Sequence, residues 1–392
     1  MRKRVLHITS SYMPPKKNKD FDFIKVKYGA SNKWTGKGYE GGRVGGLASV
    51  ISDYGIHLED YDTHVLLPQD GQPCNFTGHI DVDKRDNVTI HYFPCEGTLS
   101  HLKKVKYTLS GILSNAYPDF QFDIVVTHVV DPHQDLSKVD KKVRWINVSH
   151  GSATNSKLSD EYLDLMDSFV LMSTQQLATA PKQALNDLAI SVEGPRLIQI
   201  LAHPIDTNIY KPYHKKRDDD AVWHGRISPE KQILPFSTVF NGVFPEKKLH
   251  IIGGPDHPVH LANWERPPNT QLHGRLYEKE LGKELSKHNY YVLPSQYETF
   301  CVALLEALAC GCDVYALNSA RIERIGGIKW AEDVVTFSDS YDDICNQIIN
   351  SNSLRNELTL TERQERNIQF VKDNYSWDVL KSQYYNIWGG NL

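Results

Sequence analysis

Short, continuously apolar runs recur along the whole chain, separated by longer stretches with helical periodicity. Twelve such runs are rich in β-branched and aromatic residues: 5–9, 64–67, 89–93, 122–128, 143–150, 169–173, 197–202, 221–224, 249–253, 271–272, 290–293 and 313–317. Runs of this length without polar alternation are typical of strands that are buried on both faces of a parallel sheet. The pattern therefore predicts parallel strands in both halves of the chain.

Amphipathic segments fall between these runs and predict helices at residues 47–58, 103–116, 160–166, 276–287 and 302–309. Strands that alternate with helices over the full length indicate an α/β protein. Because 392 residues exceed the size of one ordinary core, we expect two doubly wound, Rossmann-like domains.

The proposed boundary follows a proline-rich segment and a charged run. We expect an N-terminal domain at 1–205, a linker at 206–220 and a C-terminal domain at 221–375. The tail, 376–392, has the pattern of an amphipathic helix with an aromatic face and is assigned to the N-terminal domain.

Composition narrows the class of protein. The chain is 40% hydrophobic with a net charge of -4, which is typical of a globular protein and excludes one that is basic throughout. The six cysteines form no CxxC pair, and the chain contains neither a signal-peptide core nor eighteen consecutive apolar residues. We therefore expect a cytoplasmic protein without a transmembrane segment. The oligomeric state is left open.

Ligands of open α/β sheets bind beyond the carboxyl ends of the strands, so the segments after each strand carry the candidate chemistry. Gly45 and Gly46 belong to a glycine-rich loop before a predicted helix, where backbone amides can approach an anion. A glycine turn without a ligand explains this loop equally well.

Two cations follow the first strand of the second domain. Arg226 and Lys231 lie five positions apart in the segment 224–231. Arginine can grip two oxygens at once and lysine acts as a point charge, a combination that suits a diphosphate. The alternative is a solvated loop with two exposed cations.

The segment 294–311 contains two glutamates eight positions apart. Glu298 is expected in a polar loop and Glu306 two turns into a helix that begins at Phe300, with Thr299 as its N-cap. A carboxylate inside an apolar helix must accept hydrogen bonds, which ribose hydroxyls would donate. Alternatively, Glu306 lies on a solvated face.

This segment resembles the E-x7-E motif of retaining glycosyltransferases with the GT-B fold, the group that contains glycogen and sucrose synthases. Other motifs agree in order: Gly45 to Val50, His150-Gly151, residues 201–206 with 210–212, residues 224–231, residues 252–254, and Ser376-Trp377. The resemblance covers nearly the whole chain and implies two Rossmann-like domains facing a cleft.

The resemblance also implies residue roles. Arg226 and Lys231 would stabilise the departing nucleoside diphosphate, Glu298 would bind sugar hydroxyls, Glu306 would bind the ribose, and His150 would contact the sugar. The remaining donor-binding positions would be Gly45, Gly46, Leu276, Thr299, Phe300 and Cys301. Transfer in this group retains the anomeric configuration and needs no carboxylate base, cofactor or metal. Asp81 and Asp83 have the spacing of the DxD motif that binds metal in metal-dependent transferases, but we interpret them as surface acids in a polar loop.

Three departures from the family pattern bear on specificity. Cys301 stands where the family usually has glycine, and its side chain would narrow the sugar pocket. Arg43 replaces the lysine of the K-x-G-G-L motif of glycogen synthases. An insertion at 14–40 interleaves lysines with aromatic residues, and its candidate acceptor-side residues are Lys25, Lys27, Lys33, Trp34 and Lys37.

Basic residues interleaved with aromatics suit a polyanion that carries rings, although a mobile loop that closes on the donor would have the same composition. We expect transfer of a glucose-like hexose from a UDP sugar to an anionic acceptor, with a hydroxymethylated base in DNA as one candidate. Small sugars, sugar phosphates and polysaccharides are alternative acceptors. A nucleotide-sugar epimerase and a catalytically silent nucleotide-binding protein are the other classes.

Overall fold

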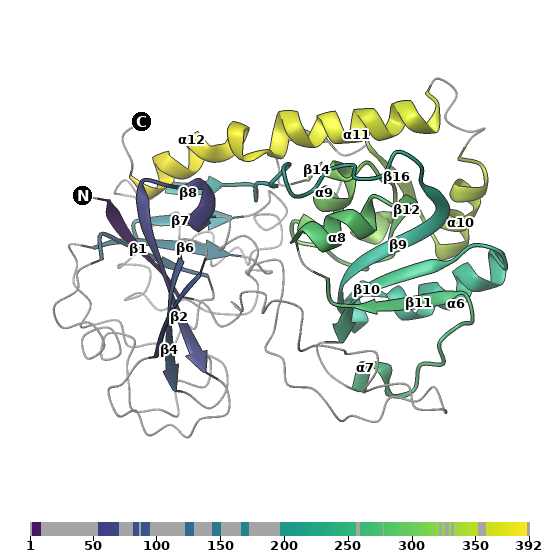
Figure 1. Ribbon diagram of the computed structural model, residues 1–392, viewed down its shortest axis with the longest axis horizontal. Helices are drawn as coiled ribbons and strands as arrows, with labels where there is room; N and C mark the ends of the chain where they lie inside the picture. The colour runs from purple at the N-terminus through teal and green to yellow at the C-terminus, as the bar shows by residue number, and fades with distance from the viewer. Residues whose placement is uncertain are drawn as a thin grey trace. The chain divides into compact units, whose positions relative to one another are not determined.

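A computed structural model describes fourteen segments of the protein. They are residues 2–8, 54–69, 81–85, 88–94, 122–128, 143–149, 166–171, 197–255, 259–276, 278–320, 324–325, 329–330, 333–351 and 358–389. These segments form two compact units (Figure 1). The N-terminal unit holds the described residues up to 202 together with 381–389, and the C-terminal unit holds the described residues of 203–380.

The N-terminal unit is built on an eight-stranded sheet with the order β3-β4-β2-β1-β5-β6-β7-β8. Its strands are β1 (Lys3–Ile8), β2 (Tyr61–Gln69), β3 (Asp81–Arg85), β4 (Val88–Pro94), β5 (Ile124–Thr127), β6 (Arg144–Ser149), β7 (Ser168–Leu171) and β8 (Leu197–Ile200). All neighbours pair in parallel except β3 and β4. This parallel order confirms the α/β class.

The C-terminal unit contains a six-stranded parallel sheet with the order β11-β10-β9-β12-β13-β16. Its strands are β9 (Asp218–Ile227), β10 (Leu249–Pro255), β11 (Thr270–Gly274), β12 (His288–Leu293), β13 (Asp313–Leu317) and β16 (Val335–Ser338), with a small ribbon of β14 (Arg324–Ile325) and β15 (Lys329–Trp330). The helical elements are η2 (Pro229–Lys231), α6 (Ile233–Val243), α7 (Val259–Ala262), α8 (Glu278–Leu285), α9 (Val302–Ala309), η3 (Asn318–Ala320), α10 (Tyr341–Ile349), α11 (Leu360–Tyr375) and α12 (Trp377–Trp388), whose last residues belong to the N-terminal unit.

All twelve predicted runs contain strands, but several other details differ from the sequence prediction. Asp81 and Asp83 lie in strand β3 and not in a polar loop, because this edge strand pairs antiparallel with β4 and needs no apolar run. Strand β9 begins at Asp218, inside the segment assigned to the linker. The tail continues from a long helix, α11, that the sequence analysis missed.

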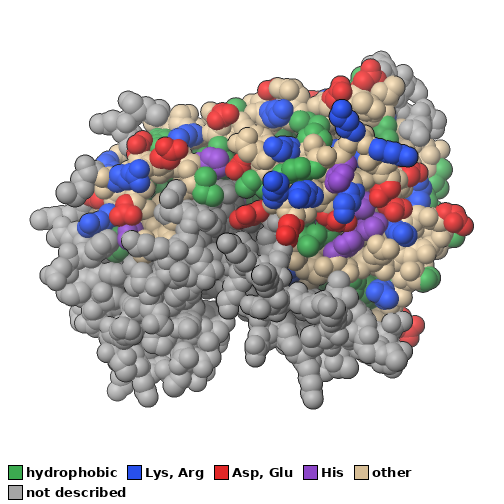
Figure 2. Space-filling view, viewed as in Figure 1, with side chains coloured by type: hydrophobic (Ala, Val, Ile, Leu, Met, Phe, Trp, Pro, Cys, Tyr) green, Lys and Arg blue, Asp and Glu red, His purple; other side chains and the backbone are tan. Residues whose placement is uncertain are grey.

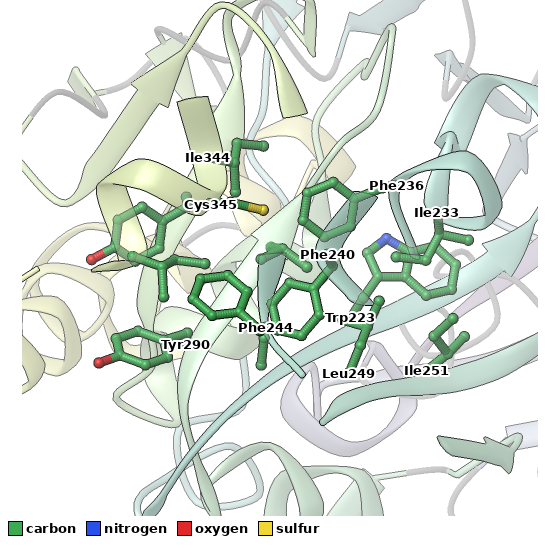
Figure 3. Packing of buried hydrophobic residues seen from close by; sticks show 14 of the residues in the cluster. Trp223, Ile233, Phe236, Phe240, Phe244, Leu249, Ile251, Tyr290, Ile344 and Cys345 are labelled. Atoms are coloured by element: carbon green, nitrogen blue, oxygen red, sulfur yellow. The ribbon is translucent and has the colours of Figure 1, made fainter. Parts of the chain in front are cut away.

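Aromatic residues of α6 form the centre of the C-terminal core. Phe236 and Phe240 of α6 and the residue that caps its C-terminus, Phe244, follow one another at four-residue spacing. Figure 3 shows Phe240 next to Trp223 of β9 and Phe244 on the side of Tyr290. The rings of Phe240 and Phe244 lie 4.8 Å apart. The four-residue spacing puts these rings on one face of the helix, and that face covers the sheet.

The last turns of α12 complete the core of the N-terminal unit. Trp388 packs edge-on against Tyr54, with ring centroids 5.0 Å apart, and is 2% exposed. The Tyr384 hydroxyl donates to the carbonyl oxygen of Ala202 at 2.9 Å. These contacts explain the aromatic face of the tail. In the part of the chain that is described, no helix combines the length and apolar character needed to cross a membrane.

A buried ion pair joins α11 to the sheet. Arg363 Nε donates to Asp313 Oδ2 at 3.1 Å, and the two side chains are 1% and 0% exposed. Tyr315 donates to the same oxygen at 2.9 Å. Because both charges are removed from water, each depends on the other for compensation.

We therefore expect Arg363→Met to lower the free energy of unfolding by about 3–5 kcal/mol, since it leaves the Asp313 carboxylate buried without its cation. The double variant Arg363→Met/Asp313→Asn should lose less free energy of unfolding than Arg363→Met alone. Urea unfolding followed by circular dichroism measures both, and a double variant less stable than the single one would contradict the compensation.

Candidate functional site

The candidate site lies at the carboxyl ends of β9 and β12, which are adjacent in the sheet. The backbone is closely packed at this edge. A Cβ placed on Gly253 would lie 1.8 Å from the carbonyl oxygen of Gly225, and Gly253 has a φ of 142°. Only glycine fits there, so the ends of β9 and β10 are held together without intervening side chains.

Lys231 and Glu298 form the central ion pair. The Lys231 Nζ donates to both carboxylate oxygens of Glu298 at 2.7 Å. The Ser295 hydroxyl donates to Glu298 Oε1, also at 2.7 Å. The side chains of Lys231 and Glu298 are 22% and 7% exposed. Glu298 is thus fixed by two donors, while the lysine remains reachable from solvent.

This pair keeps the lysine charged. Burial opposes the ammonium form, but the Glu298 carboxylate outweighs that effect and raises the pKa of Lys231 above its ordinary value. Two of the three N–H donors of Lys231 are directed to Glu298, and within the described part of the chain the third has no acceptor and can bind an anion.

Glu306 lies on α9 and is 6% exposed, so the alternative of a solvated face is wrong. Its Oε2 lies 2.7 Å from Nε2 of His224, near the end of β9. This partner is not predicted from the sequence, although His224 directly precedes Gly225 and Arg226 in the 224–231 motif. The Nδ1 atom of His224 is buried and has no hydrogen-bond partner among the described residues.

Arg226 is more exposed than Lys231 and has its own partner. Its Nη2 donates to Glu230 Oε1 at 2.8 Å, and its side chain is 48% exposed. Ser228 donates to the same oxygen at 2.6 Å. Both predicted cations thus lie near the carboxyl end of β9, but each is paired with a different glutamate.

The start of α9 differs from the prediction. The helix begins at Val302, and its N-cap is Cys301 with φ 63° and ψ 62°; Thr299 is not the cap, and Phe300 precedes the helix. The left-handed backbone at Cys301 interrupts helical geometry, which is why the helix cannot begin earlier. With this start, Glu306 is little more than one turn into the helix. Glycine adopts a positive φ without steric cost. This backbone conformation therefore explains why the family that the chain resembles usually has glycine at this position.

The remaining predicted residues are distributed as follows. Leu276 follows the end of β11 and is half-buried. Phe300 packs edge-on against His203, with ring centroids 5.1 Å apart. Several predicted residues lie outside the described part of the chain: Arg43, Gly45, Gly46, His150, Lys25, Lys27, Lys33, Trp34 and Lys37.

Comparisons with known proteins bear on the family and the fold. Residues 205–325 match the family described as "Glycosyl transferases group 1". One subunit of human phosphatidylinositol N-acetylglucosaminyltransferase is 25% identical over 188 residues, which span 45% of this chain and 35% of the human protein. The aligned part is therefore about a third of that relative.

Solved structures match the whole chain at low identity. Sucrose-phosphate synthase from Thermosynechococcus elongatus is 14% identical with a TM-score of 0.69, and the match covers 99% of this chain and 98% of that one. The catalytic domain of starch synthase IV from Arabidopsis thaliana, bound to ADP and acarbose, is 12% identical with a TM-score of 0.65, covering 99% of each chain. These likenesses show the GT-B fold.

Together, the comparisons show that the chain has the GT-B fold and that residues 205–325 are similar to the glycosyltransferase group 1 family. The E-x7-E glutamates of the resemblance, Glu298 and Glu306, lie inside the matched domain, and both are buried.

The left-handed conformation at Cys301 predicts an inverted order of stability. At most positions alanine is more stable than glycine, but at a φ of 63° the Cβ costs about 1 kcal/mol or more. We expect Cys301→Gly to unfold at higher urea concentration than Cys301→Ala. Equilibrium unfolding of the two variants, compared with wild type, measures this. If the alanine variant were the more stable of the two, the backbone conformation described for Cys301 would be wrong.

Proposed function

We propose that the protein transfers a glucose-like hexose from UDP to an acceptor hydroxyl with retention of the anomeric configuration. The observation that carries the proposal is the Lys231–Glu298 ion pair at the carboxyl edge of a Rossmann-like sheet, in which one ammonium N–H has no acceptor among the residues that the structure describes. A diphosphate oxygen would accept that hydrogen bond.

The proposed donor lies along the carboxyl edge of the C-terminal sheet. The diphosphate would sit between Lys231 and the first amides of α9, where the helix N-terminus favours an anion. Arg226 would reach the same phosphates after exchanging Glu230 for a phosphate oxygen. Glu306 contacts His224 Nε2 at 2.7 Å through one carboxylate oxygen, and its carboxylate has further acceptor capacity for ribose hydroxyls.

In the reaction, the acceptor oxygen forms a bond to the anomeric carbon as the bond from that carbon to the diphosphate breaks. The acceptor proton passes to the departing diphosphate oxygen, so no protein carboxylate is required as a base. The chain's contribution is electrostatic, since Lys231 and Arg226 stabilise charge that grows on the leaving group. Glu298 acts by positioning Lys231 and by accepting hydrogen bonds from the sugar. No metal or cofactor is needed in this proposal.

UDP is proposed on the resemblance, with support from a solved E. coli structure described as trehalose-6-phosphate bound with UDP-2-fluoro glucose, which matches 98% of this chain at 9% identity and a TM-score of 0.65. The anionic acceptor is proposed on the lysine and aromatic residues of 14–40 alone. A hydroxymethylated base in DNA would satisfy both the charge and the ring contacts.

Removing the central cation should abolish most of the activity. Lys231→Met is expected to lower kcat/KM for the donor by about 10²–10³-fold. Lys247→Met is a matched control, because Lys247 is 23% exposed and pairs with Asp219 near the opposite ends of the strands; it should leave turnover unchanged. Release of nucleoside diphosphate measures both rates.

Lys231→Met leaves the Glu298 carboxylate buried without a cation and can therefore destabilise the fold. The double variant Lys231→Met/Glu298→Gln removes both charges, so a loss of activity in it is not caused by an unpaired buried charge. A folded double variant should remain inactive. Wild-type turnover by either Lys231 variant would overturn the proposed role of this pair.

A donor panel tests the function itself. Among the glucose donors carrying UDP, GDP, ADP and dTDP, UDP-glucose should give the fastest diphosphate release, and release should rise when duplex DNA with hydroxymethylated cytosine is added. NMR of the product should show the donor's anomeric configuration.

The alternatives give different results in the same assay. Donor turnover without any acceptor would indicate an epimerase, and nucleotide binding without release from any donor would indicate a silent binding protein. A stronger response to sugar phosphates or polysaccharides than to DNA would reject the nucleic-acid acceptor while leaving the transferase intact.

A further inference from the structure

A second cluster of ionisable side chains lies in the C-terminal unit near the amino ends of its strands. Asp218 and His288 are the first residues of β9 and β12, and His250 is the second residue of β10. Glu284 comes from α8, directly before β12. One ligand atom each from His250, Glu284 and His288 lies within 4.8 Å of the other two. The proposed donor site is at the other ends of these strands.

His288 has the arrangement of a metal ligand. Its side chain is 1% exposed, and its Nδ1 lies 2.8 Å from Asp218 Oδ1. Its buried Nε2 makes no hydrogen bond of normal length among the described residues and lies 3.5 Å from Oε1 of Glu284. Two ligand atoms at about 2.0–2.2 Å from a tetrahedral zinc ion are separated by about 3.4 Å. The gap between Nε2 and Oε1 therefore has the width that a shared zinc ion requires.

His250 repeats the carboxylate–histidine pairing. Its Nε2 lies 3.3 Å from Asp220 Oδ2, so an ion would bind at Nδ1 in place of that nitrogen's contact with His273. That Nδ1 is 2.8 Å from Nε2 of His273, and the rings of His250 and His288 stack at 4.1 Å. Histidines that bind metals commonly donate their second N–H to a carboxylate, which fixes the tautomer and the ring orientation.

We propose that His250, Glu284 and His288 form a zinc site, with Asp218 and Asp220 as its outer carboxylates. Two imidazoles and one carboxylate suit Zn²⁺, whereas Mg²⁺ and Ca²⁺ prefer oxygen ligands throughout. The ion would connect β10, α8 and β12, three elements that are separate in sequence. Its role is to stabilise the C-terminal unit, and it takes no part in the proposed transfer.

A nearby lysine and the exposure of the cluster determine whether a zinc ion can bind and enter. Lys287 contacts the other oxygen of Glu284, Oε2, but its side chain is 45% exposed and can move into solvent. Without a metal, a proton on His288 would supply the positive charge between Asp218 and Glu284. The Glu284 and His273 side chains are 12% and 23% exposed, so an ion can enter from their side. Figure 2 shows histidine side chains at the surface of the C-terminal unit among charged ones.

The test uses the full chain without a histidine tag. After chelation, one equivalent of Zn²⁺ should bind per chain and raise the unfolding temperature by about 5 °C or more, while Mg²⁺ should not. Zinc content is measured by elemental analysis and affinity by competition with a chelating dye. This arm needs only the wild-type protein, so it stands even if a variant fails to fold.

Glu284→Gln and His288→Gln should each weaken zinc binding by about 100-fold or more, since even outer-shell changes cost 10–100-fold. His214→Gln, which removes a histidine outside the cluster, should bind zinc as wild type does. Wild-type protein that gains neither zinc nor stability would overturn the proposal. Equal zinc affinity in all three variants would also overturn it, because the ion would then lie elsewhere. If the protein bound zinc but did not turn over any sugar donor, the proposed transferase function would be rejected and the zinc site would stand.

Discussion

The described C-terminal unit depends on one constraint, which is that each buried carboxylate must be matched by a specific nitrogen group. Asp313 is matched by Arg363, Glu298 by Lys231 and Glu306 by His224. The three pairs differ in what surrounds them. The Asp313 pair is closed to solvent on both sides, so it can only stabilise. The Lys231 side chain is partly exposed, and its pair can therefore exchange one partner for a ligand.

Much of the fold was predictable because buried parallel strands carry an unambiguous signal. Continuous apolar runs identified every long strand of the C-terminal sheet except β16, whose Thr336 and Phe337 are only half-buried. The helices α6 and α11 were missed for opposite reasons. The first is apolar on much of its surface, while the second is largely polar and begins with a capping box at Thr359.

The candidate site was predicted as a set of residue types but not as a set of pairs. Position in the motif identified Arg226, Lys231, Glu298 and Glu306, yet it could not show that Glu230 binds Arg226 or that His224 binds Glu306. Such pairings depend on strand register and on the direction of each side chain, and neither can be predicted from a single sequence. The cluster of His250, Glu284 and His288 could not be predicted from the sequence for the same reason. Its ligands come from β10, α8 and β12 at irregular spacing, and only the sheet brings them together.

The course of α12 has a consequence for how the chain is made. Trp388 and Tyr384 fill the core of the N-terminal unit, yet they follow the entire C-terminal unit in the sequence. The ribosome therefore releases the residues that finish the first unit only after it has synthesised the second. Domains usually fold in the order of synthesis, but here the first unit can reach its final packing only after the second has been translated. An N-terminal fragment produced alone would expose the surface around Tyr54 unless residues 381–389 were attached to it.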